Sequence, residues 1–212
     1  LHDVALSGLH VVFAVDRAGL VGADGATHHG VMDTVFLSGI PNMTVLCPAS
    51  FAELRAMLRR ALALAEENEA VSAFTADTSA GDFAELRTGK DITLCAYGTL
   101  INNVLGAAEL LHEDGIEARV VKLNRISPFR GGELSRIFGT TKRLLVAEEC
   151  SGVGCIGQRI AAILAEEGHE PQRLMLCNLG RRFIEQGSVG ELYRQCGLDA
   201  ESLARTAKEV CQ

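Results

Sequence analysis

The strongest constraint on the fold is a regular alternation of short apolar runs with longer amphipathic stretches in the second half of the chain. The apolar runs fall at 92–96, 118–123, 143–148 and 174–178. Helical periodicity follows them at 100–114, 132–138, 154–167, 189–196 and 201–210. Strands buried on both faces and separated by helices are typical of a parallel sheet covered by helices. The pattern therefore predicts a complete α/β domain over 91–212.

The first part of the chain repeats this alternation in a shorter form. Strands are predicted at 11–15, 43–47 and 71–74, and helices at 1–8, 31–38 and from 51 to about 67. Ser50 and Glu53 form a capping box at the start of the last of these helices. So few elements, entered in the middle of a helix, would leave sheet edge and apolar surface uncovered. We therefore expect residues 1–80 to be the C-terminal portion of a larger domain, joined by a linker at 81–90 to the second domain.

Charge and cysteine content exclude several classes of partner. Lys and Arg number 20 against 27 Asp and Glu, a net charge of −7, and neither part of the chain is basic. We therefore expect neither nucleic acid nor membrane as a partner. No apolar run approaches the ~18 residues of a membrane-spanning helix. The 7 cysteines lack close Cys-x-x-Cys pairs, which predicts buried reduced thiols and a cytoplasmic location.

The stretch that could carry chemistry is the glycine loop, residues 16–30, which follows the predicted strand at 11–15. Open α/β sheets bind ligands where their parallel strands end, and glycines let the backbone approach a ligand closely. Arg17 suits a phosphate or carboxylate. Thr27 as a helix N-cap would place His28 in the first helical turn, where a neutral imidazole can exchange a proton. On the residues alone, a turn-rich connection is an equal alternative, with Asp24 in an Asx turn and Arg17 meeting a surface carboxylate.

Two motifs in the second half have structural interpretations that we favour. Residues 152–157 read G-x-G-x-x-G, but Asn178 stands where a dinucleotide site needs an acid. We interpret this motif as a tight turn that lets a helix pack closely on the sheet. Glu148 and Glu149 could form an acid/base pair, but a solvated strand end is the favoured interpretation.

The glycine loop also carries a family resemblance. Residues 13–30, FAVDRAGLVGADGATHHG, followed by IPNM at 40–43, closely resemble the 1-deoxy-D-xylulose-5-phosphate synthase family of transketolase-like, thiamine-diphosphate-dependent transferases. Weaker similarity continues in the right order through 47–50, 96–99, 146–149, 183–187 and 197–199. The resemblance implies an incomplete transketolase-like pyrimidine-binding domain followed by a transketolase C-terminal-type domain with a parallel sheet.

The resemblance also implies roles for residues of the loop. Arg17 matches an arginine that grips the phosphate of the acceptor, glyceraldehyde 3-phosphate. His28 matches an active-site histidine that contacts substrate near the cofactor's reactive carbon, and Asp24 matches an acid in the same pocket. The implied reaction decarboxylates pyruvate and joins the remaining two carbons to the acceptor. Its product, 1-deoxy-D-xylulose 5-phosphate, is a precursor of isoprenoids and thiamine.

Other family features have no counterpart in the sequence. The family's residues for thiamine diphosphate and Mg²⁺ would precede residue 1, so we assign no cofactor-binding or metal residue and expect no tight cofactor binding by this chain alone. A second phosphate-binding arginine of the family is replaced at 74–81 by FTADTSAG. We expect the chain to be inactive without an N-terminal cofactor domain on the same or a separate chain, in a homodimer or heteromer. The alternatives are a non-catalytic assembly or binding module, or the β part of a split transketolase or 2-oxoacid dehydrogenase.

Overall fold

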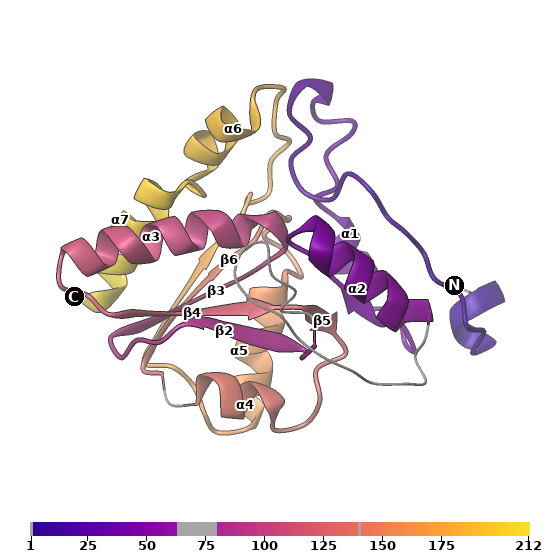
Figure 1. Ribbon diagram of the computed structural model, residues 1–212, viewed down its shortest axis with the longest axis horizontal. Coiled ribbons are helices and arrows are strands. Elements are labelled where there is room, and N and C mark those ends of the chain that lie inside the picture. Colours follow the sequence, from indigo (N-terminus) through magenta and orange to yellow (C-terminus); the bar gives the residue numbers. More distant parts are fainter. Residues whose placement is uncertain (1, 63–79, 140) are drawn as a thin grey trace.

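A five-stranded sheet with helices on both faces forms the centre of the molecule (Figure 1). The computed structural model describes residues 2–62, 80–139 and 141–212. Along the sheet the strands follow the order β2–β4–β3–β6–β7. Their bounds are Phe83–Arg87 (β2), Ile92–Tyr97 (β3), Ala118–Leu123 (β4), Arg143–Ala147 (β6) and Arg173–Cys177 (β7). The strands β4, β3, β6 and β7 are parallel, as predicted, and β2 joins β4 antiparallel at one edge.

The predicted helices of this region are also present and divide between the two faces of the sheet. They are α3 (Ile101–Glu113), α4 (Glu133–Phe138), α5 (Ile156–Glu166), α6 (Val189–Cys196) and α7 (Ala200–Cys211), and the turn Gly98–Leu100 leads into α3. Successive residues of a strand point to opposite faces. Leu94 and Ala96 of β3 accordingly pack with α3 and α7, while Cys95 packs with α4 and α5. Each face thus has its own closed hydrophobic core.

The N-terminal region, residues 2–62, has little regular structure. It contains a short π-helix His2–Leu6, a 3₁₀ turn Gly22–Asp24, α1 (Asp33–Ser38), β1 (Val45–Leu46) and α2 (Phe51–Leu62). The predicted strand at 11–15 is wrong, because this segment is irregular and Val11, Phe13 and Val15 are 45%, 56% and 52% exposed. A parallel strand needs hydrogen-bonded neighbours, and no described strand lies beside this segment. The predicted strand at 71–74 lies outside the described residues.

The N-terminal region is attached to the sheet region through β1. This strand pairs antiparallel with β5 (Arg125–Ser127), placing Val45 opposite Ser127. The N–H of Cys47 donates to the carbonyl of Asn124 at 2.9 Å. The strand predicted at 43–47 is therefore present in part. Its partner is β5, which lies about 80 residues later in the sequence, and not a strand of the N-terminal region.

The linker predicted at 81–90 contains β2, a strand of the main sheet, where we expected only a connection. Its sequence, Phe-Ala-Glu-Leu-Arg, is half-buried throughout except for an exposed Glu85. An edge strand needs only a few apolar side chains. Because Thr, Ser, Gly and Asp residues surround this short segment, its sequence resembles a linker more than a strand. In the described parts of the chain, no helix is both long and apolar enough to cross a membrane.

Candidate functional site

The glycine loop forms a closed turn beside α6 (Figure 1). Gly19 and Gly30 exchange two backbone hydrogen bonds of 3.0 Å, which tie its ends together. A Cβ on Gly30 would lie 2.4 Å from the carbonyl oxygen of Arg17, so no side chain fits at this position. Arg17 itself has a φ of 58°, a left-handed conformation that costs free energy for a residue other than glycine. The ends of the loop are thus held by close backbone contacts.

Two of the predicted site residues meet on the outer side of this loop. Arg17 Nη1 lies 3.3 Å from Asp24 Oδ2, and the two side chains are 54% and 50% exposed. An exposed ion pair of this kind contributes little to stability, because solvent screens it. The Arg17 guanidinium therefore has a carboxylate partner and remains accessible to a ligand.

His28, the third predicted residue, lies on the following turn and is exposed. Its Nδ1 is 2.9 Å from Thr27 Oγ1, and its backbone N–H donates to Gly25 at 3.0 Å. The prediction that Thr27 caps a helix is wrong, since α1 begins at Asp33 with Met32 in the N-cap position. The turn closed by Gly25 and His28 comes first and separates the histidine from that helix.

His29 is a contact residue that the sequence did not distinguish from its neighbour. Its Nδ1 accepts a hydrogen bond from the N–H of Val21 at 3.0 Å, and its Nε2 lies 3.5 Å from the carbonyl oxygen of Glu185. Because Nδ1 accepts, Nε2 carries the proton and donates to the carbonyl. His29 therefore joins the loop to the C-terminal region, residues 80–212, whereas His28 contacts Thr27 and is exposed.

A shallow hollow of about 750 Å³ lies between the loop and the start of α6. Its walls are Val21, Gly22 and Ala23 on one side and residues 186–189 on the other. The N–H of Gly187 donates to the carbonyl of Gly22 across it at 3.3 Å. Segments far apart in the sequence thus form one surface next to the residues predicted to bind substrate.

Of the two carboxylates after β6, Glu148 is buried and Glu149 is half-buried, so the solvated strand end that we favoured is wrong. Glu148 accepts hydrogen bonds from Tyr97 Oη at 3.1 Å and from the N–H groups of Ile156 and Gly157 at 2.9 and 2.8 Å. It therefore satisfies the N-terminus of α5. Glu149 points the other way, and burial raises its pKa. The carboxylates have separate partners, which argues against a shared acid/base role.

The turn between β6 and α5 confirms the structural interpretation of the motif at 152–157. A Cβ on Gly157 would lie 2.6 Å from Leu176 Cδ2 and 2.8 Å from Glu148 Oε1. Glycine at this position lets the helix approach the sheet and accept its carboxylate cap.

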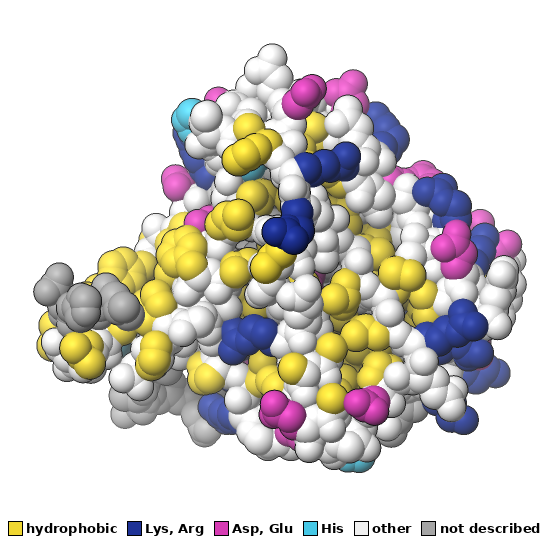
Figure 2. All heavy atoms as spheres, turned by 180° about the vertical axis from the view of Figure 1, so that it is seen from behind, with side chains coloured by type: hydrophobic (Ala, Val, Ile, Leu, Met, Phe, Trp, Pro, Cys, Tyr) yellow, Lys and Arg dark blue, Asp and Glu magenta, His cyan; other side chains and the backbone are white. Residues whose placement is uncertain are grey.

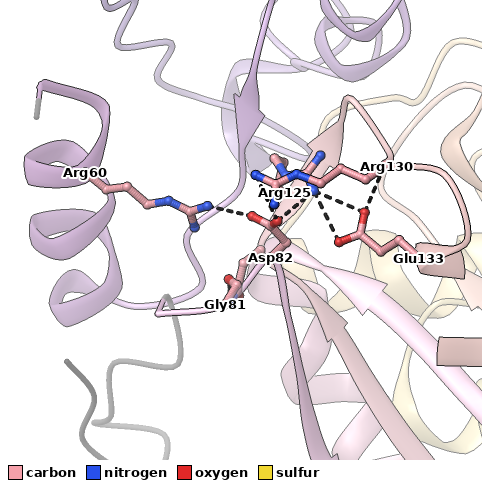
Figure 3. Close-up of polar contacts among 7 residues, drawn as sticks. Arg60, Gly81, Asp82, Arg125, Arg130 and Glu133 are labelled. Carbon is pink, nitrogen blue, oxygen red and sulfur yellow. Dashed lines mark hydrogen bonds and ion pairs between the residues drawn. The ribbon is translucent and has the colours of Figure 1, made fainter. Parts of the chain in front are cut away.

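A second polar cluster joins α2 to the sheet region (Figure 3). Asp82 accepts from Arg60 at 2.6 Å and from Arg125 at 2.7 Å, and Arg125 also contacts Glu133 at 3.1 Å. The hydrogen bond from Arg125 lowers the pKa of Asp82 well below its usual range. A hollow of about 480 Å³ beside the cluster is lined by acids and arginines in similar number. These mutual ion pairs make the cluster a structural junction.

The described residues do not form a cofactor or metal site of their own. No cluster of His, Cys, Asp or Glu suited to a metal ion occurs among the residues whose placement is described. The loop glycines, which could have cradled a diphosphate, face protein atoms. A Cβ on Gly19 would meet Glu149, one on Gly22 would meet Gly187, and one on Gly25 would meet Gln186. We therefore assign no chemical step to a group held by this chain alone.

Comparisons with known proteins agree over most of the chain. The family profile for the transketolase pyrimidine-binding domain matches residues 1–79, and that for the transketolase C-terminal domain matches residues 81–203. The chain is 37% identical to a 1-deoxy-D-xylulose-5-phosphate synthase from Chlorobium luteolum, an alignment that covers 99% of this chain and 35% of the relative. A synthase of the same name from Thermus thermophilus is 34% identical over 97% of the chain and 34% of its own length. The chain thus spans about a third of the length of these curated relatives.

Solved structures give the same fold. A split-gene transketolase, described as an inactive β4 tetramer, matches with a TM-score of 0.74 and 26% identity, over 90% of this chain and 65% of that chain. A transketolase variant from Pichia stipitis matches with a TM-score of 0.73 at 20% identity, over 98% of this chain and 31% of its own. The α/β fold, the order of the motifs and the two family matches lead to one conclusion: this chain belongs to the transketolase family, with pyrimidine-binding and C-terminal domain sequences similar to the C-terminal third of 1-deoxy-D-xylulose-5-phosphate synthases.

Proposed function

We propose that this chain is part of a thiamine-diphosphate-dependent transferase that condenses pyruvate, with loss of CO₂, and glyceraldehyde 3-phosphate to 1-deoxy-D-xylulose 5-phosphate. The observation that carries the proposal is the 37% identity to a synthase of that name over 99% of the chain. Residues 1–80 are the proposed part of its pyrimidine-binding domain, and residues 91–212, together with β2, are the proposed part of its C-terminal domain. The chain's 7 free thiols fit a reducing compartment, so we place the protein in the cytoplasm.

Arg17, Asp24 and His28 are the proposed substrate residues. The guanidinium of Arg17 would bind the acceptor phosphate through two parallel N–H groups, since its planar fork matches phosphate oxygens. Asp24, 3.3 Å away, would hold that guanidinium toward the ligand. The exposed imidazole of His28 would exchange a proton with a substrate oxygen. Thiamine diphosphate, when bound, would supply the nucleophilic carbon that reacts with pyruvate and allows it to lose CO₂.

The proposed cofactor-binding part is carried either elsewhere on the same polypeptide or on a partner. Support comes from the exposed apolar side chains of the N-terminal region: Leu6, Leu9, Val11, Phe13, Val15, Met32, Phe36, Phe51, Leu54, Leu58 and Leu62. Figure 2, which views the molecule from behind, shows hydrophobic side chains gathered on the left, the side on which the N-terminal segment lies in this view. Apolar patches rimmed by polar residues mark sites of protein association. We propose that the polypeptide with the cofactor domain covers this surface.

Reconstitution tests the proposal. The chain would be mixed with the N-terminal two-thirds of a matching synthase, thiamine diphosphate and Mg²⁺, and formation of 1-deoxy-D-xylulose 5-phosphate would be measured. We expect turnover by the mixture and none by either polypeptide alone. Tight cofactor binding with pyruvate decarboxylation by this chain alone would contradict the proposal, and so would a mixture that binds substrate without turnover.

Variants then test the residue assignments. Arg17→Gln should raise the acceptor KM by roughly 10- to 150-fold, the range expected for losing a charge-assisted phosphate contact. His28→Asn should lower kcat by about 100-fold or more, as removal of a general acid–base group does. His112→Asn is the matched control, because His112 lies at the far end of α3 and contacts Glu117 instead. Wild-type kinetics in both loop variants would show that the loop is structural.

A second candidate is the β chain of a split transketolase. The structural match to the split-gene transketolase favours it, since this chain covers 65% of that protein but only about a third of the synthases. The donor distinguishes the candidates: a transketolase transfers two carbons from a ketose phosphate, whereas the synthase takes them from pyruvate. Assaying the reconstituted complex with both donors identifies which reaction it supports.

A further inference from the structure

The glycine loop is anchored in the core of the C-terminal region by Leu20. This side chain is only 7% exposed, although it lies three residues after the exposed Arg17. It packs in the hydrophobic cluster that also contains Leu179, Ile184 and Leu192. A buried leucine three residues after an exposed arginine restricts the backbone between them.

Glu149 reinforces this anchor from the end of β6. Its Oε2 accepts the N–H of Leu20 at 3.4 Å, and its other oxygen accepts the hydroxyl of Tyr193 on α6. A Cβ on Gly19 would lie 1.8 Å from the same Oε2, so the carboxylate can approach the backbone only because residue 19 is a glycine. The contact thus joins the loop, β6 and α6.

The rest of the loop is held by the same region. Besides Glu149, the N–H of Gly187 donates to Gly22 at 3.3 Å, and His29 bridges Val21 to Glu185. Beyond the loop, the N–H of Ser151 donates to the carbonyl of Val31 at 2.9 Å. Arg17 adopts its left-handed conformation at the start of this series, and such a conformation persists only where neighbouring contacts hold it.

We propose that Glu149, oriented by Tyr193, is a positioning residue that fixes the glycine loop and thereby holds Arg17 ready for the phosphate-bearing acceptor. The contacts of Glu149 with Leu20 and Tyr193, which we call the clamp, do not depend on the proposed function. Their effect on acceptor binding rests on the proposed function. The C-terminal region would then contribute to acceptor binding without any of its side chains touching the acceptor.

Hydrogen exchange on the chain as it exists tests the clamp. In Glu149→Ala the segment 17–30 should exchange about tenfold faster, because the partly buried hydrogen bond from the N–H of Leu20 is lost. Glu149→Gln keeps an oxygen acceptor and should remain within about twofold of wild type. Tyr193→Phe should fall between the two, because the carboxylate then loses the hydroxyl that orients it.

Two controls separate the clamp from a general loss of structure. Glu167→Ala removes a carboxylate that accepts from Gly132 and Ser135 of the α4 turn, so it should leave 17–30 unchanged. Protection of β3 and β6 shows whether each variant is folded. If Glu149→Ala does not fold, Tyr193→Phe decides alone. Wild-type exchange of 17–30 in the folded clamp variants would overturn the proposal.

The reconstituted enzyme supplies a second readout. Glu149→Ala should raise the acceptor KM about tenfold, because Arg17 is no longer held in place, and Glu149→Gln should keep the KM near that of wild type. A loosened loop with a normal acceptor KM would overturn the positioning role. Failure of wild-type reconstitution would instead contradict the proposed function and leave the exchange result on the clamp standing.

Discussion

The C-terminal region, residues 80–212, and the N-terminal region, residues 2–62, use similar apolar segments with opposite results. In β3 every residue is buried, because parallel strands flank it on both sides and helices cover both faces. The segment 11–15 is just as apolar, yet it is irregular and exposed. The difference shows that an apolar run becomes a buried strand only where neighbouring strands complete its hydrogen bonds.

The two regions are nevertheless joined at particular places. β1 pairs with β5, Asp82 ties α2 to β5, and Glu53 forms a buried ion pair with Lys122 at 2.8 Å. The glycine loop adds the contacts to Glu149 and residues 185–187. The exposed apolar surface therefore belongs to a segment that is fixed to the C-terminal region, which suits the interface proposed above.

Matched Phe→Ala substitutions give the sharpest test of this contrast. Phe138 is 1% exposed in the core under α4 and α5, so Phe138→Ala should lower the free energy of unfolding by about 3–5 kcal/mol. Phe13 is 56% exposed, and Phe13→Ala should change it by less than about 0.5 kcal/mol. Chemical denaturation of both variants measures the difference. A large loss from Phe13→Ala would mean that the N-terminal segment is packed in the free chain.

Lys122→Met tests the join between the regions. Lys122 and Glu53 are 1% and 3% exposed, so the variant leaves a buried carboxylate without this partner. We expect a loss of about 3 kcal/mol, the lower end for breaking a buried pair, because methionine keeps the apolar contacts of the stem. Lys208→Met is the control, since its ion pair with Asp114 is half-exposed. Equal losses in the two variants would show that the buried pair does not hold the regions together.

Most of the C-terminal region could be predicted from sequence, for a physical reason. Its strands are buried on both faces and its helices are amphipathic, so local pattern and tertiary environment agree. The strand β2 was missed because an edge strand needs few apolar residues. The strand wrongly predicted at 11–15 is the opposite case. Its apolar sequence is suited to a buried strand, but a sequence pattern does not show whether a neighbouring strand is present to pair with it.

The site divides in the same way. Arg17, Asp24 and His28 were identifiable because they occur together in one glycine-rich motif, and the structure brings Arg17 and Asp24 into contact. Glu149, Tyr193 and residue 187 lie more than a hundred residues away, and no local pattern links them to the loop. Glu149 could be found only from the fold, which places the end of β6 against Leu20.

Asp82→Asn should have a smaller effect that depends on pH. Arg125 and Arg60 hold the folded pKa of Asp82 below its ordinary value of 3.8, with Glu133 and Arg130 also near. The ionised form therefore stabilises the fold above about pH 4, and this contribution is lost as the pH falls through the folded pKa. We expect the variant to be less stable by about 1.5–2 kcal/mol at neutral pH, with the difference shrinking in acid.

The Glu149→Gln variant provides the control of opposite sign. Burial raises the pKa of Glu149 above 4.5, so the folded state favours the protonated carboxyl. Its contribution is full at low pH and is lost as the pH rises through the folded pKa. Denaturation curves from pH 3 to 8 should therefore converge toward low pH for both variants, with Asp82→Asn below wild type and Glu149→Gln at or above it. A pH-independent difference for Asp82→Asn would rule out ionisation as its cause.

The smallest expected effects come from matched helix caps in the two regions. Ser50 accepts the N–H of Glu53 at 3.2 Å at the start of α2, and Ser188 accepts that of Glu191 at 3.4 Å at the start of α6. Ser50→Ala should lower the free energy of unfolding by about 1 kcal/mol because the site is half-buried, and Ser188→Ala by about 0.5 kcal/mol because water can replace the exposed hydroxyl.

Hydrogen exchange on the two cap variants, Ser50→Ala and Ser188→Ala, then shows how far each change spreads. If the regions unfold as one unit, both variants accelerate the slowest amides of β3, whereas if α2 opens on its own, Ser50→Ala accelerates only 51–62. Partner binding should remove that local opening, because the proposed interface covers Phe51, Leu54 and Leu58 on the exposed face of α2.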